Sequence, residues 1–166
     1  MSGADLVAGV DLGRLRDPTA VVTLRGDGTI TGAHRARLGA SWRDTASTVV
    51  HLCRGVSLVA VDATGVGDAV CEALEAHGLP VLRVTFTAST KLDLLADLAQ
   101  VLHGGRLKLS PGCPGATDLE DELRRFVATP TRKGLKLSGK ATGKDDLVMG
   151  LALAIRALAR LRSRES

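Results

Sequence analysis

Two short apolar runs, each closed by an aspartate, constrain the fold of this chain more than any other feature. Residues 6–10 precede Asp11, and residues 58–61 precede Asp62. A run of four or five apolar residues without polar alternation is typical of a strand that is covered on both faces of a sheet. A carboxylate at the end of such a strand is costly unless it is paired or binds a cation.

The segments around these runs predict an α/β fold. Residues 19–24 are rich in β-branched side chains, and Asp27-Gly28 signals a hairpin into a third strand over residues 29–37. The first three strands are therefore expected to form an antiparallel meander. A right-handed crossover then places the fourth strand, residues 57–61, beside the first.

The rest of the chain alternates helical and extended patterns. Further extended segments are predicted at residues 81–85, 107–109 and 135–137. Helices are expected over residues 42–54, 68–77, 91–103, 118–127 and 144–161, with Ser41, Ser89 and Thr117 as N-caps of three of them. The order predicts a mixed sheet of five strands, or slightly more, flanked by helices.

A third acidic position opens the last predicted helix, at Asp145 and Asp146. If the start of that helix approaches the sheet edge that carries Asp11 and Asp62, the carboxylates form a site for hard divalent cations. Two ions held in this way can clamp the attacking and leaving oxygens of a phosphodiester, so we interpret the chain as a metal-dependent nuclease. The structural alternative is that Asp62 is a turn residue and Asp146 a first-turn helix acid.

Several segments, in this order, resemble the nuclease domain of phage terminase large subunits, which belongs to the ribonuclease H-like, RuvC-like superfamily. The resemblance covers nearly the whole chain. The matching segments are Gly9-Val10-Asp11-Leu12-Gly13, Asp17-Pro18-Thr19-Ala20, Val61-Asp62-Ala63-Thr64-Gly65-Val66-Gly67, Val84-Thr85-Phe86-Thr87 with Lys91, Leu119-Glu120-Asp121-Glu122-Leu123 with Phe126, and Gly143-Lys144-Asp145-Asp146-Leu147-Val148.

The resemblance implies a ribonuclease H-like fold and a DNA endonuclease that uses two divalent cations, Mg²⁺ or Mn²⁺. Its metal ligands and catalytic acids fall on Asp11, Asp62 and either Asp145 or Asp146. Asp146 is favoured because related nucleases place this ligand one helical turn before the position that Met149 occupies here. Asp17 matches a further acidic position near the family's metal site.

Double-stranded DNA is the partner that the resemblance implies. The expected backbone contacts are Lys91, Arg132, Lys133, Lys136, Lys140 and Lys144. The net charge of +4 is compatible with a polyanion, although basic clusters are also common on solvated helix faces. Aromatic residues make up only 2% of the chain, so base stacking is not expected, and DNA binding should be salt-sensitive and weakly sequence-specific.

We expect residues 1–166 to form a single nuclease domain without an ATPase, because the chain has no GxxxxGK[ST] loop. A separate packaging ATPase or portal is then the implied protein partner. No nucleotide cofactor is expected, since Thr64-Gly65-Val66-Gly67-Asp68 lacks the third glycine of a dinucleotide-binding loop. No apolar stretch approaches the ~20 residues of a membrane span. The expected setting is the cytoplasm of a bacterial host, with a phage or prophage origin.

Three alternatives remain open. A Holliday junction resolvase of the RuvC type shares the fold and the arrangement of carboxylates, and would require a dimer and branched DNA. A non-catalytic module of the same fold would bind DNA or a packaging partner, and Met149, which cannot serve as a further ligand, is compatible with this. One lobe of an actin-like or sugar-kinase ATPase would also begin with a strand and Asp-x-Gly.

Overall fold

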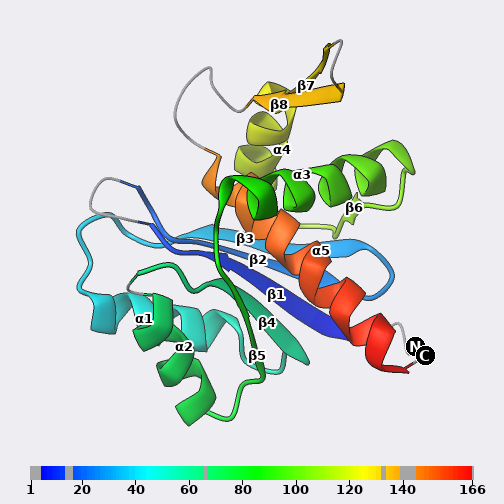
Figure 1. Ribbon diagram of the computed structural model, residues 1–166. Coiled ribbons are helices and arrows are strands. Elements are labelled where there is room, and N and C mark those ends of the chain that lie inside the picture. Colours follow the sequence, from blue (N-terminus) through cyan, green and yellow to red (C-terminus); the bar gives the residue numbers. More distant parts are fainter. Residues whose placement is uncertain (1–4, 14–16, 66, 132–133, 139–144, 166) are drawn as a thin grey trace.

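The computed structural model describes residues 5–13, 17–65, 67–131, 134–138 and 145–165 (Figure 1). The strands are β1 Leu6–Asp11, β2 Ala20–Arg25, β3 Thr29–Arg35, β4 Leu58–Asp62, β5 Val81–Val84, β6 Lys108–Leu109, β7 Val127–Thr131 and β8 Gly134–Ser138. The helices are α1 Trp42–Leu52, α2 Gly67–Ala76, α3 Ala88–His103, α4 Ala116–Arg125 and α5 Asp146–Glu165. None of the helices described combines the length and the apolar character that crossing a membrane requires.

Six strands form a mixed sheet in the order β5-β4-β1-β2-β3-β6, and β7 and β8 form a separate hairpin. The predicted meander is confirmed, because β2 pairs antiparallel with both β1 and β3. The predicted crossover is also confirmed, because β4 lies parallel to β1. The sixth strand is the extended segment near residue 108, whose Lys108 pairs with Thr29 of β3.

Helices cover both faces of the sheet, which explains the unbroken apolar runs of β1 and β4. In β1, Val7 belongs to the core under α3, α4 and α5, whereas Ala8 and Val10 belong to the core under α1 and α2. Successive residues of a strand point to opposite faces, so a strand between two cores has no polar face. Figure 1 shows α5 crossing diagonally over β1 and β2, with α1 and α2 on the other side.

Helix α5 approaches β1 unusually closely, at two glycines. A Cβ atom on Gly9 would overlap the carbonyl oxygen of Gly150 and the backbone of Ala154. A Cβ on Gly150 would lie 3.1 Å from Cγ2 of Val22. Glycine lets two backbones pack without side chains between them. This contact therefore sets the position of α5 along β1.

Two helix N-caps differ from the sequence prediction. Helix α3 is capped by Thr87 rather than Ser89, because the side chains of Thr87 and Thr90 each accept a hydrogen bond from the other's backbone N–H. Helix α4 follows Gly115 rather than Thr117. Gly115 has a φ of 72° and packs where a Cβ would overlap the carbonyl oxygen of Ala33, so contact with β3 sets this start.

Candidate active site

Asp11 and Asp62 lie at the same edge of the sheet, at the carboxyl ends of neighbouring parallel strands. The register pairs Val10 of β1 with Val61 of β4, and the two aspartates are the next residues along each strand. Asp62 is only 9% exposed, and Asp11 is partly buried. The pairing of β1 with β4 therefore brings together two carboxylates whose burial costs free energy, as the alignment of the strand ends predicted.

Asp146, the first residue of α5, reaches the same edge from above the sheet. It lies one helical turn before Gly150, and Gly150 is the residue that contacts Gly9 of β1. Asp146 is 7% exposed, whereas the neighbouring Asp145 is exposed. The glycine contact thus places the buried Asp146 near the end of β1.

The charges of these acids act on one another. Burial raises the pKa of Asp11 to about 7, helped by the nearby charges of Asp146, Asp62 and Asp145, while Lys91 opposes the rise. The pKa of Asp146 is raised to about 6 by burial and by its acidic neighbours, of which Glu122 acts most strongly. The charge of Asp146 therefore acts on Asp11, which puts the helix-borne acid within electrostatic reach of the end of β1.

Asp146 has a buried carboxylate oxygen whose hydrogen-bonding capacity is not satisfied by the described residues. Its Oδ2 atom is buried and accepts no hydrogen bond from the residues that the structure describes. Buried acceptors without a donor are rare in folded proteins, and an ion is one of the groups that satisfies them. Oxygen donors of this kind suit a hard divalent cation, so the residues present fit a Mg²⁺ or Mn²⁺ site.

The carboxylates are nevertheless not drawn together into a closed set of ligands. Within the described ranges, no group of three or more His, Cys, Asp or Glu side chains is arranged to hold a metal ion. Like charges that repel one another favour such an open arrangement. The described acids therefore lie along one edge of the sheet but do not form a complete set of metal ligands.

Hydrogen bonds fix the loops that follow β4 and β5. Oδ1 of Asp62 accepts a bond of 3.0 Å from the backbone N–H of Thr64. Oγ1 of Thr64 in turn accepts a bond of 3.0 Å from the N–H of Phe86. Asp62 is thus held in an Asx turn, which explains why the sequence also allowed a turn role for it.

Two further predicted residues lie near the acids. Lys91, in the first turn of α3, is exposed and has its Nζ 5.1 Å from the centroid of the Phe86 ring. Its charge lowers the pKa of Asp11, so it stands within electrostatic reach of the strand ends. The exposed Asp17 raises the pKa of Asp146.

The predicted basic hairpin is described only in part. The turn and the following segment fall outside the described residues, which leaves four predicted DNA contacts there: Arg132, Lys133, Lys140 and Lys144. Lys136 lies in β8, opposite Thr129 of β7, and the structure describes the backbone of this strand. The DNA-contacting role of all five stays a prediction.

A cavity of about 630 Å³ opens beside Asp17 and the loop that follows Asp62. Its lining includes Asp17, Thr64, Arg37, Leu38 and Trp42. Leu38 and Trp42 are 56% and 55% exposed, which is high for large apolar side chains. The hollow therefore reaches Asp17 and the loop after Asp62, and its lining does not include Asp11, Asp62 or Asp146.

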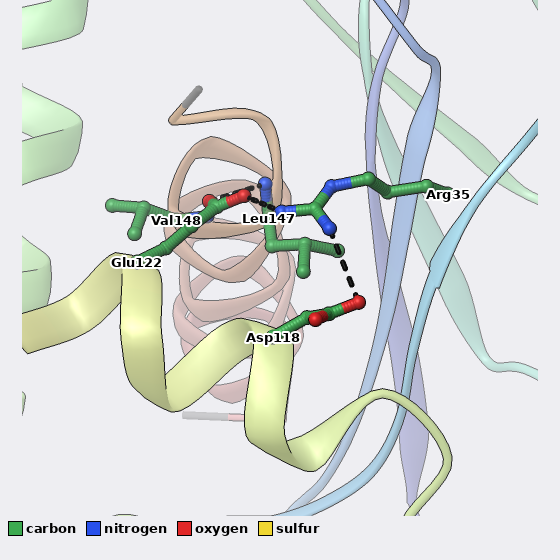
Figure 2. Close-up of polar contacts among 5 residues, drawn as sticks. All are labelled: Arg35, Asp118, Glu122, Leu147 and Val148. Carbon is green, nitrogen blue, oxygen red and sulfur yellow. Dashed lines mark hydrogen bonds and ion pairs between the residues drawn. The ribbon is translucent and has the colours of Figure 1, made fainter. Parts of the chain in front are cut away.

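Sequence reasoning missed Glu122 of α4, which caps the start of α5 (Figure 2). Glu122 is 3% exposed, and its Oε2 accepts bonds of 2.9 and 3.1 Å from the N–H groups of Leu147 and Val148. Oε1 of Glu122 is paired with Arg35. One signal was available: Leu119, Glu122 and Leu123 share a helix face, and a glutamate on an apolar face indicates a buried partner.

No family model matches the chain. Two curated relatives are the terminase large subunits of Thermus phage G20c and Thermus virus P23-45, each 32% identical over 151 residues. These matches cover 88% of this chain. The chain spans about 30% of the length of these relatives.

Solved structures match over most of both chains. The large terminase nuclease of phage G20c, with bound magnesium, is 30% identical, with a TM-score of 0.74 over 92% of this chain and 80% of that one. The nuclease domain of the Thermus phage P74-26 large terminase is 28% identical, with a TM-score of 0.71 over 90% of this chain and 77% of that one.

At 14% identity, the nuclease domain of the large terminase subunit of bacterial virus Sf6 supports the fold alone, with a TM-score of 0.70 over 93% of this chain and 89% of that one. The predicted ribonuclease H-like fold is confirmed by these neighbours and by the six-stranded mixed sheet. Identity, coverage and fold together show that the chain belongs to the large terminase nucleases of phages.

Proposed function

We propose that this protein is a metal-dependent endonuclease that hydrolyses phosphodiester bonds of double-stranded DNA. The observation that carries the proposal is the meeting of acids from β1, β4 and α5 at one sheet edge, in a chain of the large terminase nuclease family. The G20c nuclease was solved with magnesium, cobalt and zinc, and a variant of the Sf6 domain with manganese. We extend the use of divalent cations to this chain.

In this proposal Asp11, Asp62 and Asp146 would hold two divalent cations, Mg²⁺ or Mn²⁺. When bound, the ions lower the pKa of a water molecule and neutralise charge on the phosphate. The burial of Asp146 and its unpartnered Oδ2 support it over the exposed Asp145 as the ligand from α5. Asp17 is placed as an outer acid near Asp146.

The other described residues have supporting roles. The side chain of Thr64 holds the loop after β5 against the loop that carries Asp62, which keeps that carboxylate oriented. The ammonium group of Lys91 balances part of the negative charge near Asp11 and is exposed to meet a phosphate. The cavity lined by Asp17 and Thr64 would give a DNA strand room beside the loop that follows Asp62.

Backbone contacts should dominate DNA binding. We propose that Lys91 and the basic residues of the β7–β8 region contact phosphates: Arg132, Lys133, Lys136, Lys140 and Lys144. Such contacts position the duplex without reading its sequence and weaken as salt rises.

We further propose that residues 1–166 act as one nuclease domain within DNA packaging. The curated relatives are terminase large subunits, and this chain matches about 30% of their length. A packaging ATPase or a portal is the partner that would bring the nuclease to DNA. The site of action would be the cytoplasm of the infected bacterial cell.

Cleavage of supercoiled plasmid tests the proposed activity. We expect nicking and linearisation in Mn²⁺ or Mg²⁺, none in EDTA, and none with Asp62→Asn. Asp93→Asn is the matched control, because Asp93 is an exposed aspartate of α3 and its replacement should leave cutting unchanged. Linear and four-way-junction DNA, tested in parallel, separate a packaging nuclease from a resolvase. A folded protein that binds plasmid and cuts nothing in either metal would refute the proposal.

A further inference from the structure

The start of α5 is capped from outside its own segment. The first N–H groups of any helix lack partners within the helix, and a side chain close in sequence commonly supplies the acceptor. Here the acceptor is Oε2 of Glu122, from α4, which accepts hydrogen bonds from the N–H groups of Leu147 and Val148. These two residues directly follow Asp146, so the cap holds the turn that carries the candidate ligand (Figure 2).

A partly buried cation, Arg35, lies beside this cap. Arg35 of β3 pairs through Nη2 with Oε1 of Glu122, and its Nη1 lies 3.2 Å from Oδ2 of Asp118. The Nε–H of Arg35 is buried and has no acceptor among the described residues. Two carboxylates of α4 therefore hold the guanidinium on the α4 side, as Figure 2 shows.

Arg35 and Asp146 are close enough to interact but are not paired. The charge of Arg35 lowers the pKa of Asp146, while Oδ2 of Asp146 stays without a hydrogen-bond donor. Arginine forms its strongest contacts as a two-point pair with a carboxylate. If Glu122 released the partly buried guanidinium, Asp146 would be another acid near enough for Arg35 to interact with.

We propose that Glu122 is a positioning residue for Asp146. It caps the first turn of α5, and it also holds Arg35, so that the oxygen of Asp146 stays open to a metal ion. This inference rests on the proposed metal-dependent function, since it assigns Asp146 as a ligand. Outer partners of metal ligands commonly fix the orientation of the ligand in this way.

Metal binding, measured without DNA, tests the inference. The metal-free protein is titrated with Mn²⁺ and free Mn²⁺ is followed by electron paramagnetic resonance, with thermal denaturation of each variant as a check on folding. Glu122→Gln keeps an oxygen that can accept the two N–H bonds but loses the charge that holds Arg35. We expect its Mn²⁺ Kd to rise by about 10-fold or more.

Arg35→Gln separates positioning from general stability. This variant also breaks the ion pair and leaves the buried Glu122 without its cation, so it should lower the melting temperature as Glu122→Gln does. It removes the competing cation, however, and its Mn²⁺ Kd should stay at the wild-type value or fall. The double variant Glu122→Gln/Arg35→Gln should recover most of the lost affinity, a coupling that a double-mutant cycle reports. Glu120→Gln, an exposed glutamate of the same helix, is the matched control.

Two results would overturn the inference. The first is a wild-type Kd for Glu122→Gln. The second is a loss of affinity in Glu122→Gln and Arg35→Gln alike, in proportion to their melting temperatures, which would make the pair purely structural. A wild-type protein that binds no Mn²⁺ would instead refute the metal site of the proposed function, and the inference with it.

Discussion

The acids at the site are held in two different ways. Asp11 and Asp62 end neighbouring strands, and the ladder that pairs Val10 with Val61 places them through backbone hydrogen bonds. Asp146 has no ladder, and its position depends on a glycine contact with β1 and on a glutamate of α4. The strand-borne half of the site, Asp11 and Asp62, is thus placed by the repeated hydrogen bonds of a β-sheet. The helix-borne half, Asp146, is placed by a few individual tertiary contacts. The helix-borne half should therefore be the easier one to disturb.

The largest expected effect concerns which acid α5 supplies. Asp146→Asn should reduce plasmid cleavage in Mn²⁺ by more than about 100-fold, because the loss of even an outer partner of a metal ligand costs about 10- to 100-fold. Asp145→Asn is the matched neighbour and should retain most of the activity, since Asp145 is exposed. The reverse ranking of the two variants would assign the ligand to Asp145.

The glycine contact gives the next effect. Gly9→Ala should destabilise the protein by about 3 kcal/mol or more, because a Cβ there would overlap the backbone of α5 and both elements would have to move. Urea denaturation measures the change. Gly104→Ala is the control: Gly104 has a φ of −73°, and the atom nearest to a Cβ there, 3.1 Å away, belongs to the flexible Arg106 side chain. Equal stability losses in the two variants would show that the contact between β1 and α5 is not special.

The pH dependence of stability sharpens the comparison further. The pKa values of Asp11 and Asp146 are raised from 3.8 to about 7 and about 6, so the folded protein holds these protons to higher pH than the unfolded chain does. Their contribution to metal-free stability is therefore lost as the pH rises from about 4 to about 7. Mn²⁺ requires the deprotonated acids, so its stabilising effect should grow over the same range.

Melting temperatures with and without Mn²⁺, measured across that range of pH, check this prediction. Asp11→Asn should remove the larger part of the pH effect, because Asp11 carries the larger shift. An increment from Mn²⁺ that is constant with pH would mean that neither acid exchanges its proton for the metal.

The smallest effect concerns Lys91, which neighbours the strand-borne acids. Lys91→Ala should weaken DNA binding uniformly across sequences and reduce the slope of log K against log salt by about 1, as expected for one phosphate contact. Fluorescence anisotropy with labelled duplexes in Ca²⁺, at several salt concentrations, measures this slope. An unchanged slope would show that Lys91 does not contact a DNA phosphate. Its remaining role would be to balance the negative charge near Asp11.

The strand-borne half of the site was predictable from the sequence for a physical reason. Apolar runs that end in aspartate mark buried parallel strands, and parallel strands end at one edge. The mixed sheet and the meander followed from the same patterns and are confirmed. The predicted N-caps of α3 and α4 were wrong. In α3, Thr87 and Thr90 form a reciprocal capping pair, so Thr87 is the cap and not Ser89. In α4, the close contact of Gly115 with Ala33 sets where the helix begins.

The helix-borne half was only partly predictable. The start of the last helix and its acidic pair were visible, yet the means by which they reach the sheet was not. Gly9 and Gly150 are 141 positions apart, and Arg35 and Glu122 are 87 apart, so no local pattern links them. Long-range contacts of this kind appear only when the fold brings distant segments together. The catalytic roles of Asp11, Asp62, Asp146, Asp145 and Asp17 stay predictions for the experiments above.

The contact between Gly9 and Gly150 also has a consequence for folding during synthesis on the ribosome. During synthesis the ribosome delivers β1 and β4 early, while α5 is the last of the described elements to emerge. A nascent chain can pair those strands, yet it lacks the carboxylate that completes the set until α5 docks on β1. If Asp146 is a metal ligand as proposed, chains that lack α5 would carry the strand acids and leave DNA intact. In the proposed nuclease, docking of α5 on β1 would therefore have to come before any cutting.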